Sequence, residues 1–276
     1  MTKYNHLFGF KLLICFISAM GILYILYPFV SIVTFFDPQI FAVTIQDSQV
    51  QTAFLLSICT ASISTALIIL FGLPLSYVLS RFDFPGKPVL HMVVIIPLII
   101  PPLASGALLL GVFNPSSVFN KIFPDIEFTQ SILGVIIAQT YVASPFLILA
   151  SMSAFDSVDK SLENMARVLG RKNWQVFFEI SLPLAKKGIL VGILMSWIRA
   201  TGELGATMML AYNPHTISIQ IYEDNALGGL TQAIPSILLS ITLSAILILL
   251  YSVIMKKTNR NPNEKSIIKL ERFWGR

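Results

Sequence analysis

Long apolar runs without charge alternate with short polar segments along most of this 276-residue chain. A helix needs roughly 20 apolar residues to cross a bilayer, because the hydrocarbon core is about 30 Å thick. Five uncharged runs are long enough, and a sixth is interrupted only by Arg199 and Glu203. The pattern predicts an all-α integral membrane protein with one domain over 1–276. We place its six transmembrane helices at about 12–35, 50–79, 89–113, 131–154, 188–209 and 232–255.

The span predicted at 89–113 contains residues that would break an isolated helix. They are three prolines and two glycines: Pro97, Pro101, Pro102, Gly106 and Gly111. In a membrane, a broken helix is tolerated only where protein or a water-filled cavity satisfies the freed backbone groups. The segment is therefore either a simple kink or a stretch of backbone beside a transport pathway.

The composition agrees with a membrane protein, since only 12% of residues are charged and the mean hydropathy is +0.77. Soluble domains carry about 25% charged residues. If the N-terminus is cytoplasmic, all but two of the 19 Lys and Arg residues fall in cytoplasmic segments; the exceptions are Lys121 and Arg199. Positive residues favour the cytoplasmic side, so we expect both termini there. Topology and anionic lipid headgroups account for the net charge of +5, and nucleic-acid binding is not needed.

The sequence lacks the motifs of a self-contained enzyme. There is no glycine-rich phosphate loop and no dinucleotide-binding turn, and no serine lies in a nucleophile elbow. The three histidines, His6, His91 and His215, are far apart, and Cys15 and Cys59 lie in apolar runs. We therefore expect no catalytic residue, no cofactor-binding or metal-ligating set, and no ATP hydrolysis by this chain alone.

One charged, amphipathic segment interrupts the apolar pattern, in the predicted cytoplasmic loop 155–187. Apolar residues recur there at helical spacing, at Leu162, Met165, Ala166 and Leu169. Asp159 or Ser161 could cap the start of this helix, and Gly170 suits the left-handed position that ends one.

A second short helix is predicted at about 173–180, with Trp174, Phe177 and Phe178. Two such helices on the membrane surface could dock into the groove of a partner protein. They could equally rest on lipid headgroups as interfacial helices. Periodicity alone does not separate the two interpretations.

The same segment, ENMARVLGRKNWQVFFEISLPL, resembles the EAA loop of ABC importer permeases. The matching positions are Glu163, Ala166, Gly170, Ile180, Leu182 and Pro183, while Asn164 departs from the usual alanine. In that family the loop forms a coupling helix, which sits in a cleft of the ATPase subunit. The resemblance thus implies an ABC type I importer permease fold. It also implies ATPase docking by Glu163, Ala166, Arg167, Gly170, Ile180, Leu182 and Pro183.

A second stretch, 196–223, resembles the oxyanion permeases of the molybdate, tungstate and sulfate group. The shared positions are Arg199, Gly202, Glu203, Gly205, Ala206, Leu210 and Ala211. Its continuation, AYNP followed by IYE, is more similar to the tungstate and molybdate permeases. The implied function is the pore-forming subunit of an importer of tungstate or molybdate, with a sulfate or thiosulfate permease as the alternative.

Arg199 and Glu203 lie within a predicted span, where each charge costs roughly 2.5–3.5 kcal/mol on insertion scales. Their i, i+4 spacing allows pairing on one helix face. They could form a structural ion pair, or they could line the translocation pathway together with Gly202 and Gly205, which allow close helix approach. Both interpretations stay open at this stage.

The resemblance also implies partners. These are a second copy of the permease, two ATPase subunits that bind ATP and Mg, an extracellular or periplasmic oxyanion-binding protein, and the lipids of a prokaryotic cell membrane. The short basic tail, 256–276, leads us to expect no built-in regulatory domain. The rival interpretation is a stand-alone secondary transporter, but the chain has no clear internal repeat, and Glu203 is its one plausible intramembrane carboxylate.

Overall fold

The computed structural model describes residues 2–259, and every regular element in this range is helical. The all-α prediction is therefore confirmed for the described residues. Along the chain the elements are α1 Thr2–Leu26, η1 Tyr27–Phe29, α2 Val30–Phe35, α3 Pro38–Gln46, α4 Ser48–Arg81, α5 Lys87–Ile99, α6 Pro102–Phe113, α7 Val118–Ile122, α8 Ile132–Asp156, α9 Lys160–Val168, α10 Asn173–Val176, η2 Phe177–Ser181, α11 Leu182–Thr201, α12 Gly205–Leu210 and α13 Ile217–Asn259.

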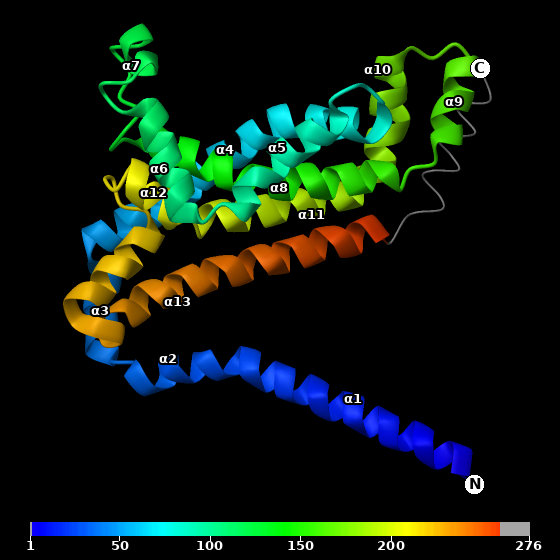
Figure 1. The fold of residues 1–276 in the computed structure, drawn as a ribbon. Coiled ribbons are helices and arrows are strands. Elements are labelled where there is room, and N and C mark those ends of the chain that lie inside the picture. Colours follow the sequence, from blue (N-terminus) through cyan, green and yellow to red (C-terminus); the bar gives the residue numbers. More distant parts are fainter. Residues whose placement is uncertain (1, 260–276) are drawn as a thin grey trace.

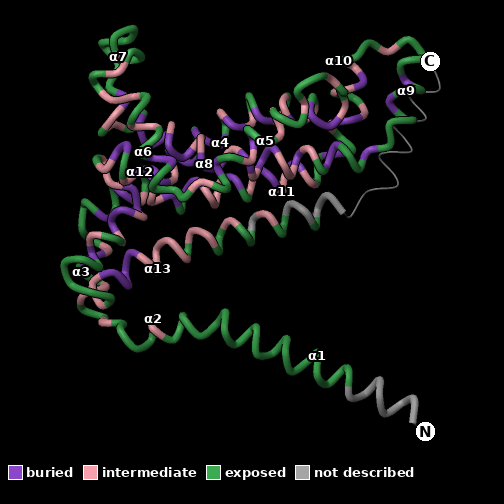
Figure 2. Tube along the Cα trace, viewed as in Figure 1, coloured by how far each residue is buried: buried purple, intermediate pink, exposed green. Residues whose placement is uncertain are grey.

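Helix α8 is the centre of the fold and packs extensively against both α4 and α11 (Figure 1). Buried residues concentrate in these three helices, whereas α1 from Phe10 onwards and most of α2 are exposed (Figure 2). One core cluster joins all three helices through small and aliphatic residues: Ala61, Ile68, Ala143, Leu147 and Ala200. This bundle is the frame on which the other elements are placed.

Glycines set the short distance between α8 and α11. A Cβ added to Gly188 would lie 2.5 Å from the Cβ of Ala154, and one on Gly192 would lie 3.2 Å from the carbonyl oxygen of Leu147. Because lipid tails are as apolar as leucine, helices in a membrane associate mainly through such close packing of small residues. The Ser196 hydroxyl adds a hydrogen bond across the interface, to the Ala143 carbonyl at 3.0 Å.

Five stretches of the described chain are long and apolar enough to cross a membrane. They are Phe10–Phe35, Ser48–Arg81, Pro102–Ile122, Ile132–Asp156 and Ile217–Val253. Helix α11 corresponds to the sixth predicted span; it has 20 residues and carries Lys186, Lys187 and Arg199. The structure thus holds five to six candidate spans.

Two of the predicted spans are broken helices in the structure. The one at 89–113 divides into α5 and α6, because Ile100 and Pro101 are extended and the residue before a proline disfavours the helical conformation. The one at 188–209 divides into α11 and α12 after Thr201. The prolines of the first span had indicated its break, whereas the break in the second span was not predicted.

Helix α13 also begins earlier than the span predicted at 232–255. It starts at Ile217 and bends at Gly229, whose φ of 70° is left-handed. The buried Asp224 joins the two sides of the bend, since its carboxylate accepts hydrogen bonds from Gln220 Nε2 at 2.8 Å and Ser236 Oγ at 2.6 Å. Two polar donors satisfy a carboxylate that burial would otherwise destabilise.

Helix α1 lies apart from the bundle (Figure 1), and its apolar side chains from Phe10 onwards are exposed. It begins at the end of the molecule where α13 finishes and where α9 and α10 lie. Helices α3, α7 and α12 lie at the opposite end. Of the predicted basic tail, 256–276, residues 260–276 lie outside the described part of the chain.

Candidate functional site

The charged segment forms α9 at one end of the bundle, with both ends of the helix fixed by local hydrogen bonds. Of the two predicted caps, Asp159 is the one used: its Oδ1 accepts from the Ser161 backbone N–H at 2.8 Å. This backbone hydrogen bond holds the pKa of the Asp159 carboxyl below its ordinary value. A carboxylate is also favourable beside the positive end of the helix dipole.

Gly170 ends α9 with a φ of +86°, as the sequence predicted. The Gly170 N–H donates to the Arg167 carbonyl and the Arg171 N–H donates to the Ala166 carbonyl, both at 3.0 Å. This pair of bonds is the Schellman motif, which satisfies carbonyls left free at a helix end. A side chain at 170 would meet no neighbouring atom, so the glycine serves the backbone conformation alone.

The apolar stripe of α9 does not pack against the rest of the chain. Ala166 is buried, but the larger residues are exposed; with the neighbouring Val168 they form the α9 apolar face, defined as Leu162, Met165, Val168 and Leu169. Val168 is 88% exposed. An apolar face on an otherwise polar helix marks a surface that contacts another molecule.

Glu163, predicted to dock the ATPase, is only 1% exposed and points into the protein. Its Oε1 accepts hydrogen bonds from Arg81 Nε at 2.9 Å and from Ser181 Oγ at 2.7 Å. Arg167 is half-exposed, with Nη2 at 3.5 Å from Glu163 Oε2. The structure thus places Glu163, Ala166, Arg167 and Gly170 on one short segment. Arg167 and Gly170 are exposed, whereas Glu163 and Ala166 are buried.

The second helix of the segment is shorter than the predicted 173–180: α10 ends at Val176, and η2 continues it as a π-helix. Phe177 packs inward on Tyr77, with ring centroids 4.8 Å apart. Trp174 and Phe178 point outward and are exposed. Of the remaining motif positions, Ile180 and Leu182 are half-buried and Pro183 is exposed in the first turn of α11.

The predicted pathway residues lie at the break between α11 and α12. Arg199 Nη2 is 2.5 Å from Glu203 Oε2, with side chains 26% and 1% exposed. Oε1 of Glu203 accepts from the Ala206 N–H at 2.6 Å, so this carboxylate also caps α12. The ion pair is present, and its arginine remains accessible.

The two glycines of this set differ in their surroundings. A Cβ on Gly205 would lie 2.7 Å from the Pro102 Cβ and 2.9 Å from the Leu103 backbone nitrogen, so this glycine lets α12 approach α6. A Cβ on Gly202 would meet only the Ile198 carbonyl, at an ordinary 3.5 Å. Gly205 is therefore required for packing, whereas Gly202 is exposed at the end of α11.

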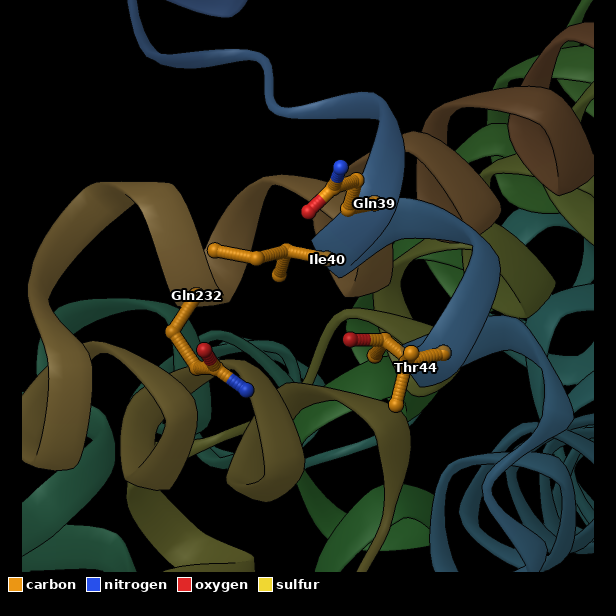
Figure 3. A pocket seen from close by; sticks show the side chains of 5 residues that line it. Gln39, Ile40, Thr44 and Gln232 are labelled. Atoms are coloured by element: carbon orange, nitrogen blue, oxygen red, sulfur yellow. The ribbon is translucent and has the colours of Figure 1, made fainter.

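Two polar features at the end opposite α9 were not predicted. The first is centred on Glu223: the Tyr212 hydroxyl donates a hydrogen bond to its carboxylate, and this bond raises the pKa of Tyr212. His215 Nδ1 lies 3.3 Å from Oε2 of the same carboxylate. A hollow of about 260 Å³ lies between α3 and α13, and Gln39, Thr44 and Gln232 line it (Figure 3). Sequence gave no signal for the hollow, because α3 lies between predicted spans.

Comparison with known proteins gives a consistent result. Residues 68–260 match the family described as binding-protein-dependent transport system inner membrane component. A probable molybdenum ABC transporter permease protein of Haloferax volcanii is 40% identical over 234 residues, which are 84% of this chain and 86% of that protein. The molybdate/tungstate transport system permease protein WtpB of Thermococcus kodakarensis is 36% identical, over 82% of this chain and 90% of its own length.

Solved structures share the fold at lower identity. A bacterial alginate ABC transporter, crystallised in complex with an alginate pentasaccharide-bound periplasmic protein, superposes with a TM-score of 0.66 at 20% identity, covering 91% of this chain and 93% of that chain. The MetNI methionine ABC transporter in an inward-facing conformation has a TM-score of 0.62 at 16% identity, covering 76% of this chain and 95% of that chain. These similarities establish the arrangement of helices, without bearing on substrate.

Proposed function

The chain belongs to the family of binding-protein-dependent transport system inner membrane components, and on that premise we propose that it is the pore-forming subunit of an ATP-driven importer of molybdate or tungstate. The observation that carries the substrate class is the 36–40% identity, over more than four fifths of the chain, to permeases named for these oxyanions. The chain is a multi-pass membrane protein, and its helices supply the wall of the pathway.

We assign ATP and Mg binding to a separate ATPase subunit, which docks on the α9 apolar face. Support comes from the exposure of this face and from the fit of Glu163, Ala166 and Gly170 to the EAA pattern. Burying an apolar face of this kind against a partner is favourable by roughly 25 cal/mol for each Å² removed from water. Docking would thus transfer the conformational change of the ATPase to the permease.

The end of the molecule that carries α9 faces the cytoplasm in this proposal. It holds most of the basic residues between the spans: Arg81, Lys87, Lys160, Arg167, Arg171, Lys172, Lys186 and Lys187. Helix α1 begins and α13 finishes at this same end, so both terminal helices would have their ends in the cytoplasm (Figure 1). An oxyanion-binding protein would then dock near α3, α7 and α12.

Two copies would form the pore. Helix α1 is exposed from Phe10 onwards and lies apart from its own bundle, so a second copy offers it a packing surface (Figure 2). ATP binding by two ATPase subunits would draw the two α9 helices together. This would shift the pore between outward- and inward-facing states through differential stabilisation of one state.

Reconstitution tests the function. Proteoliposomes that contain the chain, the ATPase and the binding protein should take up molybdate or tungstate only when ATP is present. Calorimetry of the binding protein against tungstate, molybdate and sulfate identifies the anion. Uptake by the chain alone, driven by a proton or sodium gradient, would instead establish a secondary transporter, and tight binding of sulfate alone would establish a sulfate importer.

A further inference from the structure

The buried carboxylate of Glu163 joins three parts of the molecule. Arg81, the last residue of α4, donates to it at 2.9 Å, and Ser181, the residue before α11, donates at 2.7 Å. Arg167, one turn further along α9, lies 3.5 Å from its second oxygen. A single side chain of α9 is therefore bonded to helices that precede and follow it in sequence.

Arg81 reaches beyond this carboxylate. Its Nη2 donates to the Val158 carbonyl at 2.9 Å, and the adjacent Ser80 hydroxyl donates to Asp156 Oδ1 at 2.5 Å. Asp156 ends α8, and Val158 lies in the connection to α9. The last turn of α4 thus holds the whole connection from α8 to α9, as well as α9 itself.

Apart from the bonds to Glu163, the main tertiary contacts of α9 among the described residues are with α10 and η2. On this helix only Glu163 and Ala166 are buried, while the α9 apolar face is exposed. Beside the ion pair lies a hollow of about 380 Å³, bordered by Arg81, Glu163 and Arg167. This hollow lies between α9 and the end of α4, and the bond from Arg81 to Glu163 links its two sides.

Stability alone does not explain a buried ion pair, because well-packed apolar residues are often as stabilising. What charge-assisted hydrogen bonds add is direction, since the planar guanidinium fork fixes both distance and angle. Arg81 is 4% exposed and Glu163 is 1% exposed, so solvent screens this ion pair only weakly. The pair is suited to holding α9 at one position relative to α4.

We propose that the Arg81–Glu163 pair transmits the displacement of α9 to α4, and through Ser181 to α11. The inference rests on the proposed function, in which an ATPase moves α9. Arg81 is then a positioning residue: it acts through Glu163 and needs no contact with the ATPase or the anion. Because α4 and α11 both pack on α8, a pull at this one carboxylate reaches the entire central bundle.

The test is a double variant, Arg81→Gln with Glu163→Gln, which leaves no buried charge unpaired. We expect it to insert in the membrane; co-purification of the ATPase and ATP hydrolysis are measured on the same preparation, so that uptake is expressed per ATP hydrolysed by the assembled complex. The number of oxyanions taken up per ATP hydrolysed should fall roughly tenfold, within the range typical of coupling between sites. Uptake per ATP equal to that of the wild type would overturn the proposal.

A matched control is available in the same region. The exposed pair of Lys87 and Asp83, 2.9 Å apart, lies just after α4, and the variant Asp83→Asn with Lys87→Gln should keep the wild-type ratio. A role in folding alone would reduce the amount of assembled complex but would leave the ratio unchanged. If the double variant does not accumulate, the single variant Arg81→Lys is measured instead, since it keeps the charge but loses the planar guanidinium fork. A lowered number of oxyanions taken up per ATP supports the proposal, and an unchanged number contradicts it.

A second measurement separates this inference from the proposed function. Addition of ATP to the complex should alter hydrogen exchange in both α9 and the last turns of α4, but only in α9 in the double variant. Equal changes in α4 in both proteins would refute the link, whatever the transported substrate is. Wild-type proteoliposomes that import neither molybdate nor tungstate would refute the proposed function and leave the exchange test valid.

Discussion

Glu163 illustrates how a residue can fit a motif and still occupy an unexpected place. The EAA resemblance implies that it docks the ATPase, and that role stays a prediction. In the structure its carboxylate is buried among Arg81, Ser181 and Arg167, so an ATPase would first meet the residues around it. Ala166 is buried as well, so the contact that we propose with an ATPase would be made by the exposed Leu162, Met165, Val168 and Leu169.

Arg199 and Glu203 form the ion pair that their spacing allowed, and a variant series can separate its structural role from a pathway role. Arg199→Met should lower the free energy of unfolding by about 2 kcal/mol. This is less than the roughly 3–5 kcal/mol for a fully buried pair, because water reaches Arg199. Adding Glu203→Gln should recover the stability, since no carboxylate is then left unpaired. Thermal unfolding in detergent measures both effects.

Uptake measured on the same double variant addresses the pathway. We expect stability to return while uptake stays slow, because the variant lacks Arg199, the member of the pair that is 26% exposed and so accessible to an anion. Full recovery of both the stability and the rate of uptake would show that the ion pair has a structural role alone.

At the scale of the element, α9 is a small helix with one exposed apolar face. Val168→Asp places a charge in that face, so it should abolish co-purification with the ATPase while the chain still inserts in the membrane. Val118→Asp is a matched control, because Val118 is also exposed, at 73%, on α7 at the opposite end of the molecule (Figure 1). Retained binding by the Val168 variant would exclude α9 as the docking helix.

The contact between α8 and α11 gives a second prediction at this scale. Gly192→Val would push a side chain against the Leu147 backbone, and overpacking of this kind destabilises a protein by about 1–3 kcal/mol. Gly111→Ala should have little effect, since a Cβ there meets no atom within 4 Å. The two variants are compared by their melting temperatures in detergent. Similar melting temperatures would show that α11 can move away from α8 with little loss of stability.

At the scale of the whole molecule, α1 is the element that the isolated chain leaves unexplained. Its exposed apolar side chains could face lipid, but its distance from the bundle favours contact with a second copy (Figure 1). Native mass spectrometry of the complex should show two permease copies, and removal of residues 2–26 should shift the population towards one copy. A truncated chain that still assembles in pairs would contradict a role for α1 in the dimer.

The sequence by itself determined the membrane class, the all-α fold, the amphipathic segment and the turn at Gly170. Each of these depends on local physics: the thickness of a bilayer, helical periodicity and the left-handed conformation of glycine. The resemblance of 163–183 and 196–223 to importer permeases supplied the family, which the comparisons confirmed.

Only the tertiary structure decided which charges meet. Arg81 and Glu163 are 82 positions apart, and their contact depends on where α4 ends and on how α9 is rotated. The break after Thr201 likewise depends on packing between helices, since Gly205 at the start of α12 approaches Pro102 of α6 closely. Hydrophobic periodicity reports that a face is apolar; it does not report which neighbour covers that face, because the neighbour is chosen by distances and angles between distant helices.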